Sequence, residues 1–225
     1  MNSIGLSDSH QFQESNHELI PISPGTDMNK VLIADHPDIF VVEDFFSQAE
    51  CHAMIAKSEA VGFGDAPINL AGGPVVDKKM RNNERVMIDD PNLATTIWDR
   101  LRPFVPEKRG TGWVSSGLNE RFRFYRYDPG QRFDWHLDGY YERSPSERSA
   151  YTFMIYLNEG FAGGSTEFML HGDEGGPNSE LITRIVPKTG MALVFFHRMP
   201  HQGAPVLAGR KYVLRSDVMY RWIGT

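Results

Sequence analysis

The chain has 225 residues, of which 40% are apolar and 23% charged, proportions typical of a soluble globular protein with one sizeable core. Its net charge of −6 disfavours a duplex nucleic-acid partner, which calls for a basic surface. The single cysteine cannot form an internal disulfide, and no apolar run is long enough to cross a membrane, so we expect a cytoplasmic protein without membrane contact.

The amino-terminal segment differs in composition from the rest of the chain. Residues 1–30 are polar and rich in Ser, Asn and Gln, which predicts a flexible tail ahead of a single folded domain over 31–225. Within that domain we expect order to begin near His36, with a first strand at 38–42 (DIFVV).

Two helices are predicted from their terminal signals. Ser47 and Glu50 have the spacing of a capping box, and Gly62 is placed to end the helix that follows. A second helix is predicted to begin at residues 90–91 (DP) and to end before Pro103, with its apolar residues on one face.

The second half of the chain changes from helical spacing to alternation, with Gly- and Pro-containing loops between the alternating runs. Helices followed by many antiparallel strands predict a mainly β, α+β fold, either a small β-barrel or a double-sheet jelly roll backed by the helices. The strands are predicted at 121–128, 151–157, 181–186, 191–196 and 211–219.

A candidate metal site begins at His136 and Asp138, because positions i and i+2 of an extended segment point to the same side. A third ligand is available after the strand at 191–196, where His201 competes with His197. Two imidazoles and one carboxylate on one side of an ion leave positions open for a 2-oxo acid and dioxygen, as in non-haem iron oxygenases. A structural zinc site would instead close its coordination shell, usually with cysteines.

Six short segments occur in an order and spacing that resemble the catalytic core of the prolyl 4-hydroxylase-like family of 2-oxoglutarate/Fe(II)-dependent dioxygenases. The segments are 126–131 (RYDPGQ), 136–138 (HLD), 156–158 (YLN), 163–168 (GGSTEF), 201–203 (HQG) and 209–212 (GRKY). The resemblance implies a double-stranded β-helix (jelly roll) in which His136, Asp138 and His201 bind iron and are the catalytic residues. It favours His201 over His197, because Gly203 follows at the family's spacing.

The resemblance also implies a basic residue about ten positions after the distal histidine that holds the far carboxylate of 2-oxoglutarate, which corresponds to Lys211. Arg215 is the alternative, because it shares a face of the same strand and can bind a carboxylate through two bonds. Family positions further imply that Tyr127, Thr152 and Tyr156 line the co-substrate pocket. Each of these three is equally compatible with an ordinary core position.

The segment that covers the active-site mouth in the family corresponds to 81–85 (RNNER). We predict substrate contact for Arg81 or Asn83, with Tyr140 and Trp222 as further candidates. A solvated charge cluster is the alternative for this segment.

The resemblance implies a hydroxylase that uses Fe(II), 2-oxoglutarate and dioxygen, with ascorbate as a supporting reductant, and that releases succinate and carbon dioxide. The substrate is either a protein residue such as prolyl or a small metabolite, and the sequence does not distinguish the two. It does not indicate the oligomeric state either. Two other readings are a metal-dependent β-barrel enzyme that does not use 2-oxoglutarate and a catalytically silent binding module. The presence of His136, Asp138, His201 and Lys211 together argues against the silent module.

Overall fold

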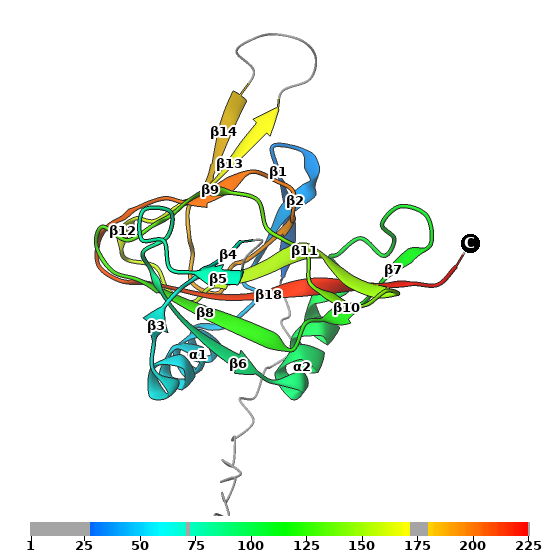
Figure 1. Ribbon diagram of the computed structural model, residues 1–225, viewed down its shortest axis with the longest axis horizontal. Helices are drawn as coiled ribbons and strands as arrows, with labels where there is room; N and C mark the ends of the chain where they lie inside the picture. The colour runs from blue at the N-terminus through cyan, green and yellow to red at the C-terminus, as the bar shows by residue number, and fades with distance from the viewer. Residues whose placement is uncertain (1–27, 71–72, 172–179, 225) are drawn as a thin grey trace, which may run out of the picture.

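The computed structural model describes residues 28–70, 73–171 and 180–224. Its main element is an antiparallel ten-stranded sheet whose principal path runs β1-β2-β15-β11-β18-β8-β6-β3, with β10 paired to β11 and β7 paired to β18 (Figure 1). Its strands are β1 (Asn29–Ile33), β2 (His36–Glu43), β3 (Gly64–Asp65), β6 (Glu84–Asp89), β7 (Trp113–Leu118), β8 (Arg121–Tyr127), β10 (Glu142–Ser144), β11 (Glu147–Tyr156), β15 (Ala192–Phe196) and β18 (Lys211–Trp222).

A second sheet of four strands runs in the order β14-β13-β16-β9, and two short strand pairs, β4-β5 and β12-β17, complete the β structure. The members of the second sheet are β9 (Phe133–His136), β13 (Thr166–His171), β14 (Glu180–Ile185) and β16 (His201–Gly203). The short pairs consist of β4 (Ile68–Leu70), β5 (Gly73–Val75), β12 (Ala162–Gly163) and β17 (Val206–Ala208).

Both predicted helices form with the expected caps, as α1 (Gln48–Val61) and α2 (Pro91–Leu101). The Ser47 hydroxyl accepts from the Glu50 backbone N–H at 3.2 Å, and the Glu50 carboxylate accepts from the Ser47 N–H at 2.6 Å. This reciprocal pair satisfies two backbone donors that the first turn leaves free. At the other end Gly62 adopts a φ of 92°, a conformation that glycine reaches without steric cost.

One core lies between the helices and the ten-stranded sheet, whose lower face in Figure 1 the helices cover. Phe45 packs edge-on against Phe153 of β11, with ring centroids 5.5 Å apart. A buried ion pair between Arg100 and Glu50, at 2.9 Å, joins the two helices. Because Glu50 also caps α1, this one carboxylate fixes both the start of α1 and its position against α2.

A second core fills the space between the two sheets, and strand β11 separates the two cores. Tyr151, Phe153 and Ile155 point to the helices, whereas Met154 and Tyr156 point to the smaller sheet. This alternation confirms the predicted division of the strand into two faces. The mainly β class with supporting helices is confirmed as well.

Two outcomes concern the amino-terminal part. Strand β1 begins at Asn29, so the expectation that order begins near His36 is wrong. Residues 29–33 form a short, largely exposed strand that exists through its pairing with β2, and five residues carry too little pattern to predict it. The predicted tail falls mostly on residues 1–27, which lie outside the described part of the chain. Within the described residues, no helix has the length and apolar character that crossing a bilayer requires.

Candidate active site

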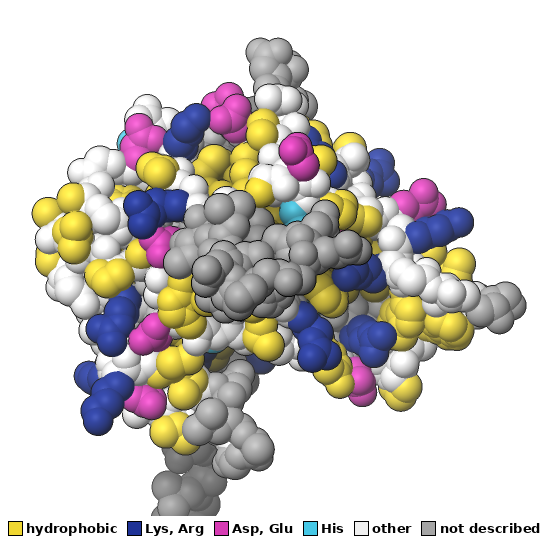
Figure 2. All heavy atoms as spheres, turned by 90° about the horizontal axis from the view of Figure 1, so that it is seen from above, with side chains coloured by type: hydrophobic (Ala, Val, Ile, Leu, Met, Phe, Trp, Pro, Cys, Tyr) yellow, Lys and Arg dark blue, Asp and Glu magenta, His cyan; other side chains and the backbone are white. Residues whose placement is uncertain are grey.

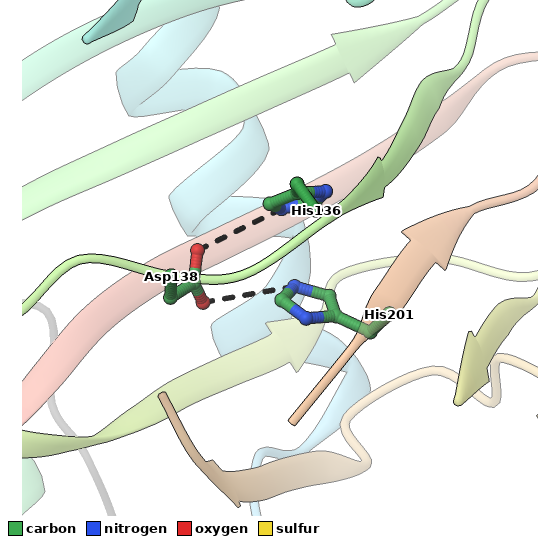
Figure 3. Close-up of side chains that lie close together, drawn as sticks. All are labelled: His136, Asp138 and His201. Atoms are coloured by element: carbon green, nitrogen blue, oxygen red, sulfur yellow. Dashed lines mark ion pairs between the residues drawn. The ribbon is translucent and has the colours of Figure 1, made fainter. Parts of the chain in front are cut away.

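The smaller sheet brings the predicted metal ligands together. His136 ends β9, His201 begins β16, and the register of these antiparallel strands places the two residues directly opposite each other. Asp138 follows β9 by two residues, and its backbone N–H donates to the carbonyl of His197 at 2.9 Å. Figure 3 shows the three side chains converging from these segments. A cluster that spans 66 positions of sequence is therefore assembled by a single strand pairing.

The donor atoms of this triad are spaced for one ion. Nε2 of His136 lies 3.7 Å from Oδ1 of Asp138, and Nε2 of His201 lies 3.6 Å from Oδ2. All three donor groups lie within 4.8 Å of one another. Donors bonded to a common ion at about 2.1 Å each stand roughly 3 to 4 Å apart. The residues therefore fit a metal ion with little movement.

Backbone carbonyl groups determine which imidazole nitrogen faces the site. Nδ1 of His136 lies 2.7 Å from the Asp134 carbonyl oxygen, and Nδ1 of His201 lies 2.9 Å from that of Met199. Since a carbonyl only accepts, each Nδ1 carries the proton, and each Nε2 presents its lone pair toward Asp138. The ring of Phe133 stacks on His136 with centroids 3.6 Å apart and holds that orientation.

Protonation states in the triad also suit a cation. Burial lowers the pKa of His136 to about 3, with a further contribution from His201, and burial likewise lowers the pKa of His201. Burial alone would raise the pKa of Asp138, but Arg215 and the two imidazoles hold it well below its usual range. At neutral pH the site therefore offers two neutral imidazoles and one carboxylate, the forms that coordinate a metal.

Three side chains hold the Asp138 carboxylate in place. Arg215 Nη1 lies 3.0 Å from Oδ1, and the Thr152 hydroxyl donates to Oδ2 at 2.5 Å. Nδ1 of His197 donates in turn to the Thr152 oxygen at 3.0 Å, and its Nε2 lies 2.8 Å from the Ser149 hydroxyl. His197 therefore supports the carboxylate and is not part of the triad. Thr152 was predicted in the co-substrate pocket; its hydroxyl is bonded to Asp138, and it is not among the residues that line the Lys211 cavity.

Lys211 shares a narrow cavity of ≈ 40 Å³ with the three triad residues. Its side chain is 2% exposed and lies over the rings of Tyr127 and Tyr156, at 5.2 and 5.5 Å. The ammonium group donates to the Gly164 carbonyl at 2.6 Å, and among the described residues no carboxylate lies within ion-pair distance of it. Burial lowers its pKa to about 7. This cation is thus desolvated without a counter-ion from the described chain.

The same cavity exposes hydroxyl groups beside Lys211. Tyr127 and Thr166 line it, and the buried Tyr156 hydroxyl donates to Thr166 Oγ1 at 2.6 Å. Burial raises the pKa of Tyr127 to about 12, so its phenol stays protonated and able to donate. Arg215 also lines the cavity, but its guanidinium is already engaged by Asp138.

A second, wider cavity of ≈ 440 Å³ is also lined by His136 and Asp138. Arg81 lines it and is 4% exposed, with its guanidinium carbon 4.4 Å from the Tyr125 ring and 4.3 Å from the Phe133 ring. Its Nε donates to the Asn83 side chain at 2.7 Å, and Asn83 itself is 1% exposed. The alternative of a solvated charge cluster is therefore wrong for these two residues.

The other two substrate candidates lie in different places. Tyr140 is exposed and lines the wider cavity. Trp222 does not line it, because β18 carries this residue to its far end, where the indole packs against Trp113 with centroids 5.7 Å apart. Sequence reasoning also missed Arg85 and Arg123, which line the wider cavity. For Arg123 a signal was available: the alternation of the strand at 121–128 places it on the same face as Tyr127, which was predicted to line a pocket.

The family model described as "2OG-Fe(II) oxygenase superfamily" matches residues 122–216, the part of the chain that contains the triad and Lys211. Among curated relatives, "Probable prolyl 4-hydroxylase 4" and "Prolyl 4-hydroxylase 2", both from Arabidopsis thaliana, are each 24% identical over 80% of this chain. The chain spans 66% of the length of each of these relatives.

Two of the solved structures that share this fold are prolyl hydroxylases. A Pseudomonas putida prolyl-4-hydroxylase matches with a TM-score of 0.60 at 20% identity, over 82% of this chain and 94% of its own. A Trichoplax adhaerens prolyl hydroxylase, solved with a hypoxia inducible factor oxygen degradation domain peptide fragment, matches with a TM-score of 0.62 at 18% identity, over 82% and 84%. These matches confirm the predicted jelly roll.

Proposed function

Because the chain belongs to the 2OG-Fe(II) oxygenase superfamily, we propose that it is a hydroxylase that inserts oxygen into a C–H bond of its substrate. The reaction consumes 2-oxoglutarate and dioxygen and releases succinate and carbon dioxide. One observation carries this proposal: His136, Asp138 and His201 converge on one point, and their cavity is shared by Lys211, a buried cation without an acidic partner among the described residues.

The triad is the site for iron(II), which when bound supplies the activation of dioxygen. His136 and His201 present Nε2, Asp138 presents its carboxylate, and the remaining positions stay open for co-substrate and dioxygen. Thr152 and Arg215 keep the carboxylate aimed at the ion by occupying its other lone pairs.

We assign the far carboxylate of 2-oxoglutarate to Lys211 rather than to Arg215. Lys211 is a buried cation without an acidic partner in the described chain, whereas Arg215 is paired with Asp138 at 3.0 Å. A carboxylate bound at Lys211 restores the charge balance that burial removes, and Tyr127 and Thr166 can satisfy its remaining lone pairs.

The substrate is a protein residue such as prolyl or a small metabolite. The names of the relatives support the first, since those proteins are called prolyl hydroxylases. The Arg81 and Tyr140 side chains in the wider cavity support contact with the substrate there, next to His136 and Asp138.

The decisive assay measures succinate formed from 2-oxoglutarate in the presence of iron(II) and ascorbate. The wild-type protein should form succinate slowly without substrate, and His136→Ala should form none. His52→Ala, which changes an exposed histidine on α1, is the matched control and should behave as the wild type. An iron-loaded wild-type protein that neither forms succinate nor gains thermal stability from 2-oxoglutarate would refute the proposal.

A further inference from the structure

Resting on the proposed function, we propose that the substrate is a small organic acid whose carboxylate is bound by Arg81 and Arg85 in the wider cavity. The hydroxylated carbon then lies beside the triad, because His136 and Asp138 form the inner wall of the same cavity. This assignment chooses the small metabolite over the prolyl peptide.

The strand register places a row of arginines on one face of the large sheet. Arg85 of β6 lies opposite Tyr125 of β8, and Arg123 of β8 lies opposite Arg215 of β18. Directly opposed residues of antiparallel strands project to the same side, so all four point toward the cavity. Arg81, just before β6, reaches the same space and contacts Tyr125.

These guanidinium groups differ in how they are neutralised. Arg123 lies 3.0 Å from Asp217, and Arg215 lies 3.0 Å from Asp138. Arg81 and Arg85 have no acidic partner within ion-pair distance among the residues that the structure describes. Nη2 of Arg81 is buried without any hydrogen-bond partner. Two cations therefore remain available for an anion that the described chain does not supply.

The charge of the cavity is opposite to that of the whole chain. Four arginines and two aspartates line it, although the chain carries a net charge of −6. On the face shown in Figure 2, basic and acidic side chains are interspersed among those that are coloured. A cleft that gathers one charge within a low-dielectric wall attracts ligands of the other sign. The two surplus cations thus favour an anionic ligand.

The volume of the cavity and the repulsion between its guanidinium groups both favour a small organic acid. The cavity volume of ≈ 440 Å³ falls in the range of about 300 to 1,000 Å³ that holds small molecules. Burial lowers the pKa of Arg85; the Tyr125 phenol opposes this effect and the neighbouring guanidinium groups add to it, so a bound carboxylate would relieve their repulsion. A neutral prolyl segment would instead leave Arg81 buried and unneutralised, at a cost in affinity.

Calorimetric titration of the iron(II)-loaded, 2-oxoglutarate-saturated protein without oxygen tests this assignment. The probes are aliphatic acids and free amino acids of about three to six carbons, each paired with its primary amide. The best acids should bind the wild type at least roughly tenfold more tightly than their amides. Arg85→Gln should abolish this preference, and Arg85→Lys should retain part of it. Arg121→Gln, at an exposed arginine paired with Asp89 on the outside, should leave it unchanged.

Equal binding of acids and amides, or an acid preference that survives in Arg85→Gln, would overturn the proposal. A glutamate-containing peptide that binds when no small acid does would also overturn it, in favour of an acidic protein substrate. Measuring succinate formation without substrate on the same preparations distinguishes a failure of the substrate assignment from a failure of the proposed function. If succinate forms but acids show no preference, only the substrate assignment fails. If acids are preferred but no succinate forms, the acid-binding site stands and the hydroxylase assignment fails.

Discussion

Replacing Lys211 with methionine should weaken the binding of 2-oxoglutarate and at the same time stabilise the protein without it. Lys211 is 2% exposed and has no acidic partner in the described chain. We therefore expect its ammonium group to bind the ligand, while its burial destabilises the protein without ligand. Methionine has a similar length and keeps the contacts of the stem without the charge.

The size of the stabilisation follows from the pKa of Lys211, which burial lowers from 10.5 to about 7. Each unit is worth about 1.4 kcal/mol, so the buried ammonium costs the free protein up to about 5 kcal/mol at neutral pH. Between about pH 7 and 10.5 the unfolded chain binds more protons than the folded one, so the stability of the free wild type rises with pH across this window. Lys211→Met should remove that rise, with its largest gain at the lower end.

Two measurements check these effects. Urea unfolding of the metal-free proteins at about pH 7 and pH 10 gives the pH dependence of the free energy of unfolding. Titration of the iron(II)-loaded proteins with 2-oxoglutarate without oxygen should show an affinity roughly a hundredfold lower for Lys211→Met, as expected when one partner of a buried charge pair is removed. Lys188→Met, at an exposed lysine, is the control. Unchanged 2-oxoglutarate affinity in Lys211→Met would refute the assignment and point to Arg215.

Four further substitutions test the site and the fold. His201→Ala should lose iron(II) binding in a metal titration, whereas His197→Ala should retain the ion with reduced affinity, since its imidazole only supports Thr152. Thr152→Val keeps the shape but removes the bond to Asp138, and should weaken iron(II) binding about 10- to 100-fold in the same titration. Ser47→Ala removes the cap of α1 and should lower the free energy of unfolding by about 1 kcal/mol in urea, with iron(II) affinity unchanged.

The parts of the fold that the sequence predicted are those with local signals. The caps at Ser47 and Asp90 act within one turn of the helices that they begin, so short motifs specify them. Strand β16 was not predicted, because it has only three residues and exists through its pairing with β9 and β13. Strand β6 was missed for a related reason: its charged residues, such as Glu84 and Arg85, do not alternate with apolar ones in the way a half-buried strand does.

The contrast between local signals and long-range strand pairing also separates the predicted parts of the site from the missed ones. His136 and Asp138 are two positions apart, and the family resemblance supplied His201 at its spacing. The contact of Arg215 with Asp138 joins residues 77 positions apart and depends on the register of several strands, which no local pattern encodes. Register likewise places Arg85 beside the arginines of β8 and β18, although residues 81–85 on their own resemble a surface cluster.

The position of Arg215 explains how one site can treat two carboxylates differently. This residue lines both cavities, and its charge is taken up by Asp138 at 3.0 Å and Asp217 at 3.6 Å. It therefore borders the cavity of Lys211 and the cavity of Arg81 without adding free charge to either. Under the two assignments proposed above, 2-oxoglutarate would place its far carboxylate at Lys211, and a second acid would bind Arg81 and Arg85 in the wider cavity. Because these cations line different cavities, we expect both anions to bind at once.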